Sequence, residues 1–354
     1  MLQFQNVSYF SFLSEFKHAD KGLVTALETL VLLVVFVVSS VGNICAIALV
    51  SRDRQLVNKN VFVLNLFIAD LLFVSTIPLI IIVRWTESWM LGTPACHVLF
   101  YIMCISGCVT IITLATISLE RMIAILKLRL APSFNVKLVS CALVFIWTFS
   151  AITSLPLCLF FQVMTVTAHG QKMQICTLRW PHVAGEIVWD IAFVGLDFLL
   201  PGVIIVISYS KILQITKSSR QRLMNRRHNS RAENHQCPVS KQDFKLFRTL
   251  FLLMVSFFLM WSPIFVATFL ILIRNFQGHL HISSTMFFWV IAFTFANSAL
   301  NPILYSIHQF RHHWRRSLCR LTKVLPFNGD RPATSSQKVA QARQTHISVI
   351  GLDD

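Results

Sequence analysis

Charged side chains are scarce in this chain: Asp, Glu, Lys and Arg together make up 13% of its 354 residues. A soluble globular domain usually carries about 25% charged residues, so an ordinary soluble protein is a poor match. The hydrophobic fraction is 55% and the mean hydropathy is +0.66. The composition therefore indicates a protein that is largely surrounded by lipid.

The chain also lacks the residue patterns that carry enzymatic or metal chemistry. Its 12 His residues lie mostly in loops and tails, and no His or Cys spacing matches a metal site. It has no glycine-rich phosphate loop, no nucleophile elbow and no internal repeat. We therefore expect neither an enzyme nor a resident organic cofactor.

Seven apolar blocks are each long enough to cross a bilayer, which takes about 20 residues. Lipid offers the backbone no hydrogen-bond partners, so each block is expected to be helical. The predicted fold class is an all-α membrane protein, a seven-transmembrane helix bundle followed by a short amphipathic eighth helix. The predicted spans are Val24–Val50, Val61–Val83, Cys96–Leu126, Leu138–Phe161, Ile187–Ile212, Leu246–Ile273 and Ile282–Ile307.

The distribution of basic residues predicts the orientation. All but six of the 31 Lys and Arg residues lie at or beyond the ends of the first, third, fifth and seventh spans. Cytoplasmic loops are enriched in these residues, so the amino terminus is expected outside the cell. The inner face, including a polar loop at about 216–242 that is expected to be flexible, suits anionic lipids and an intracellular partner. Nucleic acid is a poorer partner, because the charge lies in short loops tied to the membrane.

Four parts of the chain are predicted. Residues 1–23 form the extracellular amino terminus, without a visible cleavable signal peptide, and 24–307 form the bundle. Residues 308–321 form the amphipathic eighth helix, and 322–354 form a disordered cytoplasmic tail.

Several residues outside the spans are candidates for modification. Asn6 begins a glycosylation sequon, and Cys319 beside basic residues is a palmitoylation candidate, with an unmodified thiol as the alternative. Cys96 and Cys176 both lie on the oxidising outer side and predict a disulfide, with two free thiols as the alternative. The candidate phosphorylation sites in the tail are Thr334, Ser335, Ser336, Thr345 and Ser348.

A sparse polar set lies inside the predicted spans. An isolated acid such as Asp70 at membrane depth needs partners, and such groups usually mark function. They would surround a small cation, with sodium as the candidate, or water; the alternative is a hydrogen-bond network without an ion. The set is Asn43, Asp70, Thr110, Asn297, Ser298 and Asn301.

Motifs spread along almost the whole chain resemble those of class A (rhodopsin-like) G-protein-coupled receptors. Any one of them alone would be weak, but the complete set in this order is specific. The residues that carry the resemblance are Asn43, the run from Asn65 to Asp70, Cys96, Glu120-Arg121, Trp147, Cys176, Pro201 with Tyr209, Trp261-Ser262-Pro263, and Asn301-Pro302 to Tyr305.

The resemblance implies a switch that couples a ligand site to a G protein. Arg121 would pair with Glu120 or with Asp243, and activation would break the pair and open a groove for the G protein. Met122 stands where the family usually has tyrosine, which leaves the basal activity open. The remaining switch residues that the resemblance implies are Ile111, Pro201, Tyr209, Phe257, Trp261, Asn301, Pro302 and Tyr305.

Two positions exclude ligand classes within this family. Met103 stands where amine receptors carry an aspartate, and Phe295 stands where opsins carry the retinal lysine. The outer half instead offers aromatic rings and one cation, Arg84, which suit a long hydrocarbon with a carboxylate head. The alternative is an interfacial aromatic belt with a snorkelling arginine. The candidate lining residues are Phe73, Trp85, Trp89, Phe100, Met103, Trp180, Trp189, Phe193, Asp197, Trp261, Phe287 and Phe288.

Stretches 84–89, 208–217 and 292–300 resemble the family's receptors for long-chain free fatty acids. This resemblance implies Arg84 as the carboxylate contact. It also implies Gq/11 signalling to calcium release with Gi and arrestin branches, and roles in fat sensing, hormone secretion, inflammation and adipose tissue. The expected location is the plasma membrane, and endosomes after internalisation.

Asp197 stands where a neutral Asn is expected, and it leaves a cationic ligand open. A receptor for a different lipid or for a small peptide also stays open. A seven-helix transporter is a more remote possibility, because transporters usually show inverted repeats and this chain shows none.

Overall fold

The computed structural model describes residues 10–14, 21–52, 54–126, 136–168, 171–229, 239–277 and 282–309. The chain divides into two units, 1–309 and 310–354, and every described residue belongs to the first. The predicted eighth helix beyond residue 309, the tail, and the modification sites at Asn6, Cys319, Thr334, Ser335, Ser336, Thr345 and Ser348 lie outside the described residues. So do the side chains of Asp243 and Tyr305.

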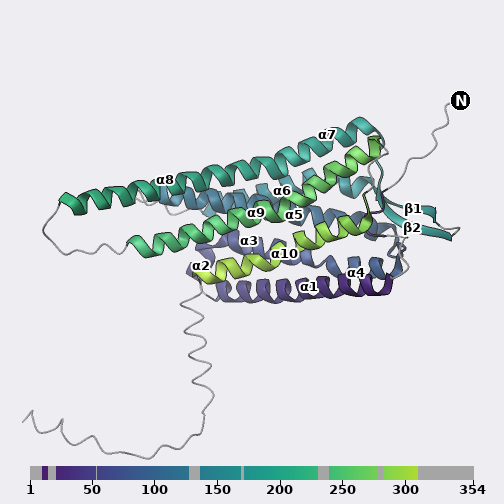
Figure 1. Ribbon diagram of the computed structural model, residues 1–354, viewed down its shortest axis with the longest axis horizontal. Coiled ribbons are helices and arrows are strands. Elements are labelled where there is room, and N and C mark those ends of the chain that lie inside the picture. The colour runs from purple at the N-terminus through teal and green to yellow at the C-terminus, as the bar shows by residue number, and fades with distance from the viewer. Residues whose placement is uncertain are drawn as a thin grey trace, which may run out of the picture. The chain divides into compact units, whose positions relative to one another are not determined.

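Helices account for most of the described chain (Figure 1). In chain order they are α1 (Lys21–Ser51), α2 (Arg54–Lys59), α3 (Val61–Val74), α4 (Ile77–Thr86), α5 (Gly92–Leu126), α6 (Val136–Phe160), α7 (Val183–Val194), the π-helical turn η1 (Gly195–Leu199), α8 (Leu200–Asn229), α9 (Val239–Gln277) and α10 (Ser284–Gln309). Two strands, β1 (Phe161–Ala168) and β2 (Gln171–Leu178), follow α6.

Seven of the helical segments are long and apolar enough to span a membrane, which confirms the predicted bundle. The second span contains a break between α3 and α4. There the hydroxyls of Ser75 and Thr76 donate to the carbonyls of Leu72 and Phe73, each at 2.7 Å. Such local side-chain bonds compete with the helical ladder and bend it. The fifth span is continuous from α7 through η1 to α8.

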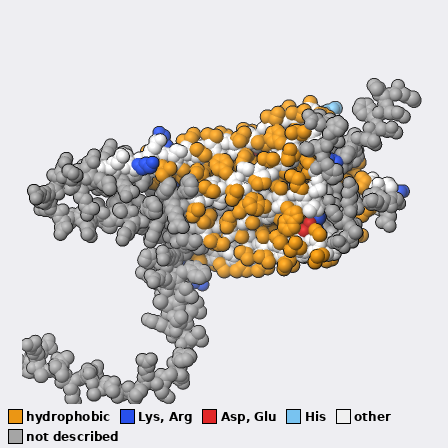
Figure 2. All heavy atoms as spheres, in the orientation of Figure 1, with side chains coloured by type: hydrophobic (Ala, Val, Ile, Leu, Met, Phe, Trp, Pro, Cys, Tyr) orange, Lys and Arg blue, Asp and Glu red, His pale blue; other side chains and the backbone are white. Residues whose placement is uncertain are grey.

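Helix α5 lies at the centre of the bundle, where it packs against α3, α6 and α8 (Figure 1). Helix α1 packs against α3 and α10, and α10 packs against α9. Hydrophobic side chains cover most of the visible face between the two ends (Figure 2). The exposed large hydrophobic residues of the described chain are mostly valines, leucines and isoleucines, as expected of helices whose outer faces meet lipid.

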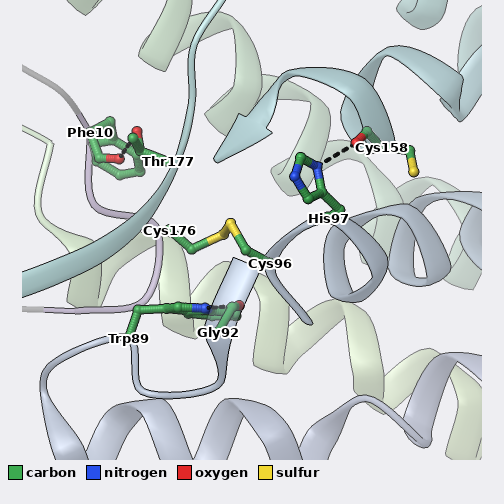
Figure 3. Close-up of a disulfide and its surroundings, with 8 residues drawn as sticks. All are labelled: Phe10, Trp89, Gly92, Cys96, His97, Cys158, Cys176 and Thr177. Atoms are coloured by element: carbon green, nitrogen blue, oxygen red, sulfur yellow. Dashed lines mark hydrogen bonds between the residues drawn. A yellow bond between two sulfur atoms is a disulfide. The ribbon is translucent and has the colours of Figure 1, made fainter. Parts of the chain in front are cut away.

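A β-hairpin caps one end of the bundle, hereafter the hairpin end, and sequence reasoning missed it. Strands β1 and β2 are antiparallel, with Phe161 opposite Leu178 and Val163 opposite Cys176. The prediction that the fourth span ends at Phe161 is therefore wrong by one residue, because Phe161 begins β1. Figure 3 shows Cys176 joined to Cys96 on α5, with a Cα–Cα distance of 5.7 Å. The predicted disulfide is thus confirmed.

The loop predicted to be flexible at 216–242 is mostly helical where the structure describes it. Helix α8 continues to Asn229, and α9 already begins at Val239. The polar composition of this segment misled the prediction, because a helix that extends beyond the membrane needs no apolar residues.

Loss of the disulfide is expected to destabilise the protein markedly. The bridge joins cysteines separated by 80 residues, and closing a loop of that length is worth about 4 kcal/mol in the chain-entropy model. Purified Cys96→Ser or Cys176→Ser variants should therefore unfold at a clearly lower temperature. Cys141→Ser, at an exposed free thiol, is the control and should leave the unfolding temperature within error. Equal unfolding temperatures for all variants would contradict this.

Candidate functional site

A buried ion pair between Arg84 and Glu28 lies toward the hairpin end. The Glu28 carboxylate accepts from Arg84 Nε at 2.8 Å and from Nη2 at 2.7 Å. The two residues are only 8% and 0% exposed, and Arg84 also lies 4.9 Å from the centre of the Phe288 ring. A charge pair buried among apolar groups persists only with good geometry and further hydrogen bonds. The bidentate contact supplies that geometry, and the ring adds a favourable cation–π contact.

The segment 10–14 packs over the same end, and four of its five side chains are buried. Its backbone carbonyls accept three hydrogen bonds: from Arg84 Nη1 to Leu13 at 2.8 Å, from Thr177 to Phe10 at 2.8 Å, and from Ser284 to Ser11. Figure 3 shows the contact between Phe10 and Thr177 beside the disulfide. The segment thus joins α4, β2 and α10.

Aromatic rings beneath that segment form a compact outer cluster. Phe12 lies 5.5, 5.2 and 5.1 Å from Phe100, Phe161 and Phe287, measured between ring centres. Phe100 and Phe161 stack at 4.0 Å with nearly parallel planes. The structure therefore brings the predicted lining residues Phe100 and Phe287 together with rings from the amino terminus and β1.

A second aromatic series, the aromatic ladder, follows α7, η1 and α9. Adjacent ring centres along it are 4.4 to 5.9 Å apart, the range of favourable aromatic pairs. In order its members are Phe160, Trp180, Trp189, Phe193, Phe265, Phe198 and Phe257. The ladder thus links predicted lining residues to Phe257, a predicted switch residue.

Trp261 closes the aromatic region from the side of α9. Its ring lies 6.0 Å from Phe73, which in turn lies 4.3 Å from Phe295. Gly107 permits this position, because a Cβ there would lie only 3.2 Å from two ring carbons of Trp261. The indole nitrogen of Trp261 is buried and has no hydrogen-bond partner among the described residues.

Three of the predicted switch residues, Ile111, Pro201 and Phe257, hereafter the triad, are all buried. Ile111 lies on α5, Pro201 on α8 and Phe257 on α9. Phe257 also stacks against Phe198 of the aromatic ladder at 5.7 Å. The triad residues therefore come from three different helices, and Phe257 is also the last member of the aromatic ladder.

Two predicted lining residues do not face this region. Trp85 is 54% exposed, and its indole donates to Thr29 on α1 at 2.8 Å. Trp89 is buried against the loop below the disulfide, and donates to the Gly92 carbonyl at 2.8 Å (Figure 3). A further predicted lining residue, Met103, is buried on α5. Trp85 and Trp89 thus serve packing of the hairpin end.

The polar set inside the bundle meets around Asp70. Its carboxylate accepts from Ser298 at 3.1 Å and from Asn301 at 2.8 Å, and Thr110 interacts with the same group. Asn43 donates to the backbone carbonyl of Ser298 at 2.9 Å. Asn297 Nδ2 and Asn43 Oδ1 are buried without a partner among the described residues, so this network has hydrogen-bonding capacity left.

Closer to the other end of α5 lie the residues of the predicted switch. Tyr209 accepts a hydrogen bond of 3.0 Å from Ser118, and Asn65 on α3 links Thr113 to Trp147 through two bonds of 2.8 Å. Glu120 and Arg121 are partly buried at the end of α5. The predicted pairing of Arg121 with Asp243 stays a prediction, because that side chain is not described.

Sequence reasoning missed Glu28 and the segment 10–14. Glu28 is the one acid in the first span, and an isolated acid in a membrane helix is itself a signal for a buried partner. Its partner stands 56 residues away, on α4, so only the fold could identify it. Phe10 and Phe12 were missed because the amino-terminal segment has a mixed composition that does not predict a buried contact.

The Arg84–Glu28 pair is expected to show strong coupling in a double-mutant cycle. Removing one partner leaves a buried unpaired charge, which costs about 3–5 kcal/mol, whereas apolar replacement of both is often nearly neutral. Arg84→Met and Glu28→Leu alone should each lower the unfolding temperature of purified protein, and the double variant should recover much of the loss. Additive losses would show that the two side chains act independently.

Comparison with known proteins agrees with this architecture. The model of the 7 transmembrane receptor (rhodopsin family) matches residues 42–305. The chain is 55% identical to free fatty acid receptor 4 of mouse over 317 residues, covering 89% of this chain and 87% of that receptor, and also 55% identical to the rat receptor over the same shares. It is 27% identical to rat somatostatin receptor type 5 over 84% of this chain and 79% of that receptor. The chain is therefore a multi-pass membrane receptor and not an enzyme, and it belongs to the rhodopsin family of seven-transmembrane receptors.

Proposed function

We propose that this receptor binds medium- to long-chain free fatty acids, including omega-3 unsaturated acids, at the plasma membrane. The observation that carries the proposal is the guanidinium of Arg84, buried at an aromatic face, in a chain 55% identical to receptors named for free fatty acids. In this proposal the hairpin end faces outside the cell. The ligand's carboxylate meets Arg84, and its hydrocarbon lies among the aromatic rings.

The ion pair with Glu28 defines where a carboxylate head would approach. Arg84 donates hydrogen bonds from Nε and Nη2 to the Glu28 carboxylate, and from Nη1 to the Leu13 carbonyl. A neutral carbonyl is a weaker acceptor than a carboxylate, so the head would displace Leu13 more readily than Glu28. Ligand binding would then replace one contact of the segment 10–14 and keep the buried ion pair.

The aromatic residues would supply most of the affinity. Each buried methylene is worth about 0.8 kcal/mol, so a chain of about 16 carbons gains roughly 12 kcal/mol before losses. Loss of motion and of side-chain freedom reduces that gain. A dissociation constant in the low micromolar range, or about −8 kcal/mol, is the resulting expectation. The faces of the aromatic ladder would also contact double bonds in unsaturated chains.

Signalling would pass from these rings to the opposite end of the bundle. Phe257 belongs to the aromatic ladder and to the triad with Ile111 and Pro201, so a ligand that shifts the ladder would bias this triad. Release of Arg121 from Glu120 or Asp243 would then open the groove for Gq/11, with calcium release as the readout. Gi and arrestin are the further partners, with endosomes as the location after internalisation. Fat sensing, hormone secretion and regulation of inflammation and adipose tissue are the proposed roles.

A small cation, sodium being the candidate, is proposed at Asp70. The group offers a carboxylate, the hydroxyls of Ser298 and Thr110, and an Asn43 oxygen without a partner among the described residues, which are oxygen ligands suited to a hard cation. Raising sodium at constant ionic strength should lower agonist affinity in the wild type, while Asp70→Asn should remove that dependence. A dependence that survives in Asp70→Asn would place the ion elsewhere.

A receptor for a peptide or a different lipid is the second candidate. The 26–27% identity to somatostatin receptors over most of the chain favours it, although the buried Arg84 and the apolar rings around it suit a charged peptide poorly.

Calcium release in cells expressing the receptor tests the proposed ligand class. A long-chain unsaturated acid should act at micromolar concentration, and its methyl ester should be weaker by about tenfold or more, because a charge-assisted hydrogen bond is worth about 1.5–3 kcal/mol. Arg84→Ala should weaken the acid but not the ester.

Two matched variants separate head-group binding from loss of stability. Glu28→Gln retains Arg84 and removes the competing carboxylate, so it should respond to the acid at least as well as the wild type. Arg179→Ala removes an exposed basic residue at the hairpin end and should change nothing. Equal potency of acid and ester, at equal surface expression, would contradict the role of Arg84, and silence to both would contradict the ligand class.

A further inference from the structure

Asp197 is a carboxyl group buried in the middle of the fifth span. Its side chain is 0% exposed and belongs to η1, the π-helical turn between α7 and α8. A π-helical turn accommodates one extra residue, redirects the side chains on it, and is frequent at functional sites. Asp197 therefore lies on a segment of a kind that often marks a functional site.

Only part of this carboxyl group is satisfied. Thr153 on α6 donates its hydroxyl to Asp197 Oδ1 at 3.2 Å, and the Cys108 thiol on α5 faces the same group. Asp197 Oδ2 is buried and has no hydrogen-bond partner among the residues that the structure describes. The hydroxyl of Ser150, one turn before Ser154 on α6, is also buried and unsatisfied within that part of the chain. Buried polar groups are nearly always paired, so both atoms point to a missing partner.

The neighbours of Asp197 belong to the aromatic region. The Thr153 carbonyl accepts from the indole of Trp189 at 2.9 Å. Phe198, the next residue after Asp197, stacks on Phe265 at 4.4 Å. Cys108 follows Gly107, which lies against Trp261. A hydrocarbon that starts at Arg84 on α4 and follows the rings toward Trp261 and Phe198 would therefore bring its distal carbons to this carboxyl group.

We propose that Asp197 selects ligands that carry a hydroxyl group on the distal part of the hydrocarbon, that is, hydroxylated long-chain fatty acids. This inference rests on the proposed function. A hydroxyl both donates and accepts, so it pairs with Oδ2 whether or not the carboxyl holds a proton. A plain hydrocarbon in the same place leaves Oδ2 unpaired, which disfavours that ligand.

The chemistry of the surroundings favours a hydroxyl over a cation. The polar groups that the structure shows against Asp197 are the Thr153 hydroxyl and the Cys108 thiol, which suit a neutral polar partner. An ammonium group would have to leave water completely to reach an acid that is 0% exposed. An alkylamine of matched length is therefore an arm of the test in which no binding is expected.

The test compares two acids of equal length, one plain and one with a single hydroxyl in its distal half. Binding to purified receptor in lipid nanodiscs is measured by the ligand-dependent rise in unfolding temperature. Wild type is compared with Asp197→Leu, which removes both oxygens, and Asp197→Asn, which keeps one oxygen for Thr153 and a polar group in place of Oδ2. Each acid partitions into the bilayer equally for every variant. A change in the ratio of their affinities between variants therefore reports binding at Asp197 and not uptake into lipid.

The measured quantity is the affinity for the hydroxylated acid divided by the affinity for the plain acid. This ratio should be about tenfold higher in wild type than in Asp197→Leu. Asp197→Asn should retain most of that preference. An equal ratio in wild type and Asp197→Leu would overturn the proposal and leave Asp197 with internal water only. If neither acid stabilises a folded wild-type receptor, the proposed function fails instead. Binding of the alkylamine, lost in Asp197→Leu, would overturn both.

Discussion

The bidentate contact between Arg84 and Glu28 organises the hairpin end of the receptor. The attraction within a buried ion pair is largely offset by the cost of removing both charges from water, so the pair contributes little net stability. Removing one partner is nevertheless very costly, because it leaves an unpaired buried charge. Because the pair joins α1 to α4 and holds the Leu13 carbonyl, it fixes the first and second spans and the segment 10–14 at one point. The disulfide fixes α5 and the hairpin at another. The aromatic rings between these two anchors are thereby held in place.

Three of the buried polar groups among the described residues contain an acid discussed above. Arg84 with Glu28 lies toward the hairpin end, Asp197 lies within the fifth span, and Asp70 lies in the network with Ser298 and Asn301. Polar groups in membrane helices are expensive and therefore mark function. In the proposed function the apolar rings would supply affinity but little orientation, so these polar groups would orient the ligand.

Sequence patterns predicted the spans well, because lipid contact demands long apolar helices regardless of tertiary detail. The disulfide was also predicted, because Cys96 and Cys176 both lie on the oxidising outer side. Ser298, Asn301 and Thr110 were predicted near Asp70, because polar residues inside the spans are few and need partners. The β-hairpin and the break at Ser75 were not, because both depend on local hydrogen bonds that apolar length does not report. Glu28 was missed because its partner is distant in the sequence, and the outward orientation of Trp85 because aromatic composition does not distinguish packing from lining.

Proximity between the ligand carboxyl carbon and the guanidinium of Arg84 is the most direct test of the account. Solid-state NMR on receptor with ¹⁵N-labelled arginine and a long-chain acid labelled with ¹³C at its carboxyl group measures it. A short ¹³C–¹⁵N distance in wild type that disappears in Arg84→Met with Glu28→Leu is the predicted result. Specific binding of the acid without any such contact in wild type would contradict the account.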